Sequence, residues 1–151
     1  MWKYVAILVL LLGFTAPVLA GDVDGRALTC KPITYPDGFH RFFVFEGTYI
    51  YEAYVTRQIP LVISRTAAHP SKATVDVISW ELKTNEYGHE ATYVHVLDRK
   101  TLSMVRSWYS AVSPQGDYQD WQCEVTYPVI VFETLNKKIK DLKESMKDNK
   151  L

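Results

Sequence analysis

The stretch FHRFFVFEGTYIYEAYVT, residues 39–56, decides the fold of this chain. Phe43 and Phe45 lie on one face of an extended segment, because side chains two positions apart point the same way in a strand. After a central glycine, which permits a tight reversal, Tyr49 and Tyr51 repeat the pattern. The stretch therefore predicts two antiparallel strands joined by a short turn.

The same period of two continues on both sides, from Leu28 to Val125, with turn-forming clusters at short intervals. The further runs predicted as strands are residues 61–65, 78–82, 93–97, 102–109 and 118–125. The clusters predicted as turns are residues 58–60, 68–71, 85–90, 98–101 and 113–117. Parallel pairing would need longer crossovers than these connections provide. We therefore predict a mainly β fold, an antiparallel up-and-down meander of seven to eight strands curling into a half-barrel or small barrel, with one C-terminal amphipathic helix.

Two cysteines, Cys30 and Cys123, stand near the two ends of the predicted meander. An even number of cysteines in an exported chain favours a disulfide, and no CxxC motif or neighbouring histidine indicates a metal pair. The outer strands of a flat eight-stranded sheet would lie roughly 30 Å apart, far beyond disulfide reach. A Cys30–Cys123 disulfide therefore predicts a curled sheet.

Residues 1–20 have the pattern of a secretory signal peptide: Lys3, then an apolar run, then small residues ending at Ala20. An uncleaved membrane anchor is the alternative, since residues 4–20 carry no charge, but Pro17 and the small residues favour cleavage after Ala20. The predicted division is a signal peptide at 1–20, a β-meander domain at 21–132 and a C-terminal amphipathic helix and tail at 133–151. The predicted location is secreted or periplasmic.

A helical period follows Pro128. Its apolar positions are three or four residues apart, and they are Phe132, Leu135, Ile139, Leu142 and Met146. Residues 129–132 are β-branched enough for one more short strand, so the helix is predicted from Thr134 onward. We expect the apolar stripe to pack on the barrel, with Leu135, Ile139 and Leu142 buried; the alternative is a helix that docks a partner.

Composition and motifs exclude several classes of function. The chain has 17 basic and 17 acidic residues, so its net charge of zero gives no electrostatic case for nucleic-acid binding. It contains no phosphate-binding glycine loop, no Gly-x-Ser-x-Gly motif and no His-Glu-x-x-His motif. His89 and His95 would lie roughly 20 Å apart along one strand, too far for one metal ion. No metal and no cofactor is predicted.

The aromatic residues are the feature of the composition that bears on function. They can be read as core packing and cross-strand pairs, or as the lining of a concave sheet that holds a ligand. The candidate ligand-binding residues are Tyr49, Tyr51, Arg65, Trp80, Tyr93, His95 and Trp108. Arg65 either orients a ligand from inside or forms an ion pair with Glu52 or Glu81.

These patterns predict an exported, non-enzymatic binding module that holds a small apolar or sugar-like ligand, or a protein surface. The expected partner is a small molecule or an extracytoplasmic protein, with no nucleic acid, no stable membrane insertion after cleavage and a monomeric state. The alternative is a small periplasmic hydrolase or isomerase that uses Tyr93, His95 and Asp98. The layout of leader, early cysteine, β-meander and late cysteine resembles small periplasmic lysozyme inhibitors; no inhibitory motif matches, so no residue role follows.

Overall fold

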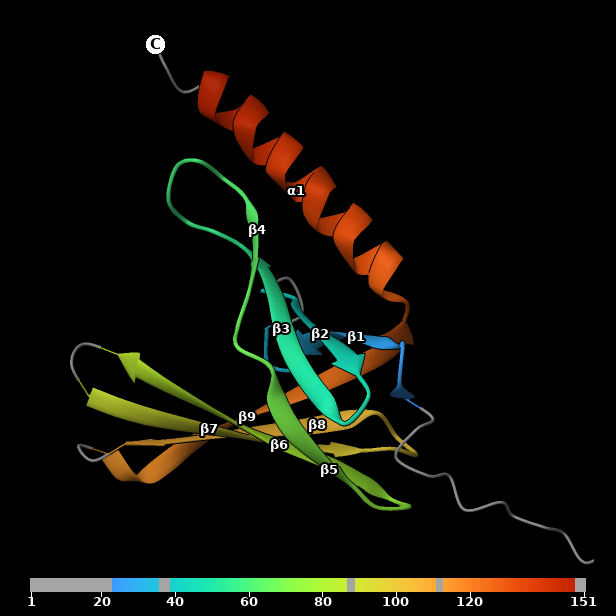
Figure 1. Cartoon of the computed structure of the whole chain (residues 1–151). Coiled ribbons are helices and arrows are strands. Elements are labelled where there is room, and N and C mark those ends of the chain that lie inside the picture. Colours follow the sequence, from blue (N-terminus) through green and yellow to red (C-terminus); the bar gives the residue numbers. More distant parts are fainter. Residues whose placement is uncertain (1–22, 36–38, 87–88, 111–112, 149–151) are drawn as a thin grey trace, which may run out of the picture.

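The computed structural model describes residues 23–35, 39–86, 89–110 and 113–148 (Figure 1). The predicted signal peptide, residues 1–20, lies outside the described residues. Within them the elements, in chain order, are β1 (Ala27–Pro32), β2 (Arg41–Glu46), β3 (Tyr49–Val55), β4 (Ile63–Arg65), β5 (His69–Ala73), β6 (Val77–Glu86), β7 (His89–Asp98), β8 (Ser103–Ser110), β9 (Ser113–Thr126) and α1 (Pro128–Asp148).

Eight of the strands form a closed antiparallel barrel. Each strand pairs with the next in the order β1, β2, β3, β5, β6, β7, β8, β9, and β9 pairs back with β1. The short β4 adds to β3 beside β5 and lies outside this ring. The predicted up-and-down meander is confirmed, and of the two predicted shapes the structure has the closed barrel.

Two predicted turns are strands instead. Residues 68–71 fall largely in β5, where Pro70 lies opposite Tyr49 of β3. Residues 113–117 begin β9, and the glycine that suggested a turn occupies an irregularity in the β8–β9 ladder. Gly116 has a φ of 66°, and a Cβ there would lie 2.5 Å from the carbonyl oxygen of Trp108. Glycine at such a position marks a bulge within a strand rather than the end of a strand.

The helix α1 begins at Pro128, earlier than predicted, so residues 129–132 are helical and do not form a strand. Proline suits the first turn of a helix, where its missing N–H would have no intrahelical acceptor. The carbonyl of Tyr127 accepts from the backbone N–H groups of Ile130 and Val131, which closes that first turn. Burial on the barrel outweighs the β-branched character of this segment, because Val131 is fully buried.

Two hydrophobic clusters lie on opposite sides of the barrel wall. One fills the barrel and includes Leu28, Phe43, Phe45, Ile50, Ile78, Trp80, Leu97, Met104, Trp121 and both cysteines. The other lies between the outer face of β1–β3 and the first half of α1, and consists of Ala27, Phe42, Val44, Tyr51, Ala53, Val131 and Leu135. Both faces of β2 are therefore buried, which explains the unbroken run of aromatic and aliphatic residues there.

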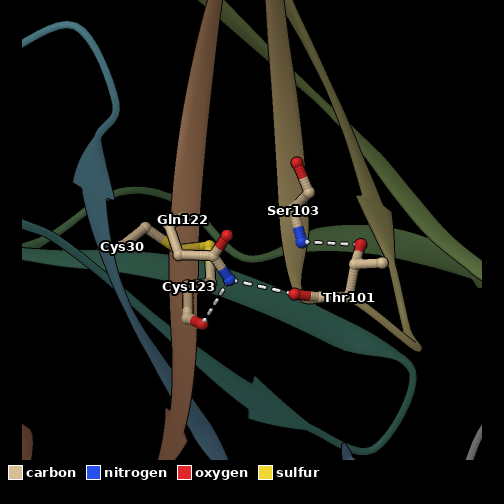
Figure 2. Close-up of a disulfide and its surroundings, with 5 residues drawn as sticks. All are labelled: Cys30, Thr101, Ser103, Gln122 and Cys123. Carbon is tan, nitrogen blue, oxygen red and sulfur yellow. Dashed lines mark hydrogen bonds between the residues drawn. A yellow bond between two sulfur atoms is a disulfide. The ribbon is translucent and has the colours of Figure 1, made fainter.

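The predicted Cys30–Cys123 disulfide is present and joins β1 to β9 inside the barrel (Figure 2). The two residues face each other directly in the β1–β9 ladder, with their Cα atoms 4.0 Å apart. Beside it, the side-chain amide of Gln122 donates to the carbonyl of Thr101 at 2.9 Å, which ties β9 to the turn before β8. The disulfide thus covalently links the first and last strands, where the meander closes into a barrel.

Candidate functional site

The inward-pointing side chains differ between the two ends of the barrel. At the end where β2 turns into β3 and β7 into β8, they are apolar and buried, and we call this the closed end. Its side chains are Leu28, Phe45, Ile50, Ile78, Leu97 and Met104. At the opposite end, where β2 begins and β8 ends, alternation turns charged, polar and aromatic side chains inward, and we call this the open end. Its side chains are Arg41, Glu52, Tyr93, Arg106, Trp108, Gln119 and Trp121.

A hollow of about 530 Å³ lies at the open end, between β2, β3, β9 and α1. Its aromatic lining residues are Tyr35, Phe39, Phe42, Tyr54 and Trp121. Its charged lining residues are Arg41, Arg57, Lys138 and Glu52, so three cations face one carboxylate and the balance is +2. An aromatic lining with a cationic excess favours a ligand that carries negative charge.

The deepest charges of this first hollow form one ion pair. The Nη1 atom of Arg41 donates to both carboxylate oxygens of Glu52, each at 2.7 Å, from the neighbouring strand. The guanidinium of Arg41 also lies over the ring of Trp121, 5.6 Å from its centroid. The hydroxyl of Thr66 accepts from the backbone N–H of Glu52 and holds that residue's backbone in place. The pair leaves the inner wall neutral, so the excess positive charge belongs to the rim.

The rim of the first hollow is organised around Phe39. Arg57, from the loop after β3, and Lys138, from α1, both lie against its ring, at 5.2 Å and 5.0 Å from the centroid. The adjacent His40 has a pKa below its usual value, first because it is partly desolvated and then because Lys31 and Lys138 repel its protonated form. A cationic rim is therefore formed by residues from two separate elements, the loop after β3 and α1.

A second hollow of about 670 Å³ adjoins the first, and the two share Tyr35 and Gln119 in their linings. Here the guanidinium of Arg106 lies over the ring of Tyr93, 3.9 Å from its centroid. Trp108 lies beside the same tyrosine, with a centroid separation of 6.5 Å. One cation, Arg106, and one carboxylate, that of Asp120, line this hollow, so it is polar with balanced charge.

His95 is buried within the barrel, between Trp80 and Arg106 on the two neighbouring strands. Its ring stacks on that of Trp80 with centroids 4.8 Å apart and planes within 2° of parallel. Burial lowers the pKa of His95 to about 3, with Arg106 and Arg41 adding repulsion and the backbone of Trp80 opposing the shift. Arg41 lines the first hollow and Arg106 lines the second, so the electrostatic environment of His95 includes one cation from each.

Several buried ring nitrogens have no hydrogen-bond partner of good geometry among the described residues: Nδ1 and Nε2 of His95 and the indole Nε1 atoms of Trp108 and Trp121. A buried donor left in this state costs about 1–3 kcal/mol. Trp121 lines the first hollow and Trp108 lines the second. Each hollow is therefore lined by a tryptophan whose buried indole N–H has no acceptor among the described residues.

The structure brings four of the predicted ligand-binding residues together inside the barrel and leaves three outside. Trp80, Tyr93, His95 and Trp108 point inward from β6, β7 and β8. Tyr49 is exposed on the outer face, and Tyr51 is buried beneath α1. Arg65 is on this outer side too, with its guanidinium 5.1 Å from the Tyr51 ring centroid, and the partner of Glu52 is Arg41 instead.

The sequence prediction missed Arg41, Glu52, Arg106, Gln119 and Trp121, which complete the open end. The alternation of side chains along the strands indicated that these residues share a face with residues of the barrel interior. Arg41 shares a face with two buried phenylalanines, Arg106 shares one with Met104, and Gln119 shares one with Trp121. An inward charge next to apolar neighbours is recognisable only once the interior face is known.

The alternative catalytic residues do not form one group. Asp98 is the last residue of β7 at the closed end, where its carboxylate accepts from the backbone N–H groups of Lys100 and Thr101 in the turn before β8. These bonds lower the pKa of Asp98 and identify it as the cap of that turn. His95 is three residues earlier on β7 and points to the opposite face of the strand.

Among the described residues, no cluster of three or more His, Cys, Asp or Glu side chains could hold a metal ion. Within the same part of the chain, no helix is both long enough and apolar enough to span a membrane. Comparisons with models of known protein families, with curated proteins and with solved structures found no match.

Proposed function

We propose that this chain is an exported binding protein whose barrel holds a small ligand at the open end. The ligand combines an aromatic or apolar ring with an anionic group. The observation that carries the proposal is the first hollow, where aromatic side chains and a +2 charge balance meet in a volume of about 530 Å³. That volume falls within the usual range for small-molecule sites.

The ring of the ligand lies against the aromatic lining, next to Trp121 and Tyr54. Its anionic group lies at the rim, where Arg57 and Lys138 face the hollow from a loop and from α1. Both cations already contact Phe39, so little side-chain ordering is needed when the anion binds.

Hydrogen-bond acceptors on the ligand complete the site. The buried indole N–H of Trp121 can only donate, and it has no acceptor among the described residues. An oxygen of the ligand that reaches this donor removes the cost of an unpaired polar group, which adds to affinity and orients the ring.

The leader pattern and the disulfide together support export to an oxidising compartment. N-terminal sequencing of the protein recovered outside the cytoplasm tests this part of the proposal. We expect a start at Gly21, within about two residues. A start at Met1 would contradict cleavage of the leader.

The ligand proposal is tested with 8-anilinonaphthalene-1-sulfonate, which joins two apolar aromatic groups to a sulfonate. We expect saturable binding, measured by probe fluorescence, with about fivefold weaker affinity for Arg57→Gln or Lys138→Gln. Lys137→Gln is the matched control, since this exposed lysine of α1 does not line the hollow. Equal affinities for Lys137→Gln and Lys138→Gln, with near-UV circular dichroism unchanged, would overturn the proposed site.

Native mass spectrometry of the protein purified from its own host addresses the natural ligand. A retained small molecule with an ionisable acid group and a ring supports the proposal. A retained neutral sugar would contradict the proposed ligand class.

A further inference from the structure

The apolar stripe of α1 runs beyond the barrel that covers its first half. Leu135 is fully buried, whereas Leu142 and Met146 are 37% and 38% exposed. In Figure 1 the second half of α1 extends beyond the strands, beside the loop between β3 and β4. A cleft of about 310 Å³ between them is lined by Ile59, Pro60, Leu61, Lys143, Met146 and Lys147.

The loop presents a further apolar side chain at this tip. Ile59 is 77% exposed, the largest exposed fraction among the large hydrophobic residues of the described chain. We call the group formed by Ile59, Leu142 and Met146 the apolar tip. Isolated exposed hydrophobic residues are ordinary, but here the helical stripe and the loop present three together at a projecting edge.

Charged residues of α1 are arranged in rows relative to the apolar tip. Lys140, Lys143 and Lys147 follow Ile139, Leu142 and Met146 by one position each, so the helix carries a lysine row directly beside the apolar row. The acidic residues Asp141 and Glu144 belong to the next row, farther from the apolar side. Among the described residues, no lysine of this row forms an ion pair.

We propose that the apolar tip and its lysine row dock this protein on an anionic lipid surface. The three exposed side chains enter the headgroup region, and Lys140, Lys143 and Lys147 contact lipid phosphates, as in amphipathic helices that lie at membrane interfaces. The charge arrangement favours this occupant, because the lysines flank the apolar row and the acids lie away from it. A stable protein interface needs about 800 Å² on each partner, more than three side chains at a projecting edge provide.

This docking does not depend on the proposed ligand. The tip residues are distinct from Arg57 and Lys138, which were assigned to the rim of the first hollow, so the two proposals fail separately. The cleft and the first hollow have no lining residue in common.

The test is co-sedimentation with vesicles, using protein purified from the soluble fraction of cells that express the whole chain. We expect binding to vesicles of phosphatidylglycerol and phosphatidylcholine in equal parts, and at least tenfold weaker binding to phosphatidylcholine alone. Binding should weaken strongly between low and high salt. Comparable binding to both lipid mixtures, or no binding at low salt, would overturn the proposal.

Two pairs of variants locate the surface. Lys143→Glu should weaken binding about tenfold or more, whereas Lys137→Glu, on the acidic side of the same helix, should have a clearly smaller effect. Ile59→Ser should weaken binding severalfold, whereas Ile130→Ser, an isoleucine 47% exposed at the other end of α1, should not. Equal losses within either pair would contradict the docking surface. A dimer in solution that Ile59→Ser dissolves would assign the tip to a second copy of the chain instead and likewise overturn the proposal.

Discussion

The closed and open ends of the barrel are built from the same strands, but the side chains that point inward are apolar at the closed end and largely polar, charged or aromatic at the open end. At the closed end, Phe45, Ile50 and Leu97 fill the interior and short turns join the strands. At the open end, the same alternation turns Arg41, Glu52 and other polar side chains inward. The closed end therefore supplies stability by excluding water, and the open end sacrifices some of that stability to offer polar groups to a ligand.

The largest expected effect concerns the bond that joins the barrel's first and last strands. Cys30 and Cys123 are 93 positions apart, and closing a loop of that length stabilises a fold by about 4–5 kcal/mol in the chain-entropy model. Cys123→Ser should lower the free energy of unfolding by an amount of that order, measured by urea denaturation. The double variant Cys30→Ser with Cys123→Ser is the control. A loss below about 1 kcal/mol would show that the apolar closed end maintains the ring without the disulfide.

The next effect is a pH dependence of stability that arises from His95 inside the barrel. The folded protein keeps His95 neutral down to a pKa of about 3, whereas in the unfolded chain it is protonated near pH 6.5. Between these values the unfolded chain binds more protons, so stability falls as the pH is lowered through this window. Near pH 4 the loss from this residue should be about 3 kcal/mol.

His95→Phe provides the control for this pH effect, since it keeps a ring against Trp80 and removes the titrating group. Thermal melting between pH 7 and pH 4 should show a smaller decline for the variant than for the original chain. Equal declines in melting temperature for the two proteins would show that groups other than His95 cause the acid sensitivity.

A comparable loss is expected where the outer face of the barrel meets α1. Leu135→Ala removes a fully buried side chain and should cost about 3 kcal/mol, measured by urea denaturation. Leu142→Ala, farther along the same stripe, should cost less than about 1 kcal/mol because that side chain is partly exposed. Equal costs would mean that the second half of the helix also packs on the barrel in solution.

A small effect on stability is expected inside the open end. Glu52→Gln replaces the carboxylate partner of Arg41 by a neutral amide, which keeps one acceptor oxygen, in a pair that is only partly buried, so the cost should be about 1 kcal/mol. The same change removes the negative charge of the first hollow and should tighten binding of 8-anilinonaphthalene-1-sulfonate severalfold. Weaker binding of the anion would contradict the electrostatic part of the proposed site.

The barrel could be predicted because its evidence is local and repeated. Alternation in residues 39–56, short connections and two cysteines near the ends of the meander were enough for a curled antiparallel sheet. The predictions that were wrong concern sequence features that are compatible with two different structures. Gly116 indicates a turn or a bulge, and a β-branched run after Pro128 fits a strand or a helix. In each case the neighbouring elements decide the outcome.

The candidate site was only partly predictable, because a period of two defines two faces and does not say which one is inside. Tyr51 was expected to face a ligand, but α1 covers it on the outer wall. Arg41 was not expected at the site, although it shares the inner face with Phe43. The assignment requires barrel closure and the position of the helix, which are properties of the whole chain.

The claim that the open end holds the ligand is tested most directly by nuclear magnetic resonance with ¹⁵N-labelled protein and 8-anilinonaphthalene-1-sulfonate. We expect saturable shifts of the Trp121 indole N–H and of the backbone amides of Arg41 and Ala53, which line the first hollow. We expect no comparable shifts in the closed-end turns at residues 46–49 and 98–102. Shifts concentrated in those closed-end turns, or a Trp121 indole signal that stays in place at saturation, would contradict the claim.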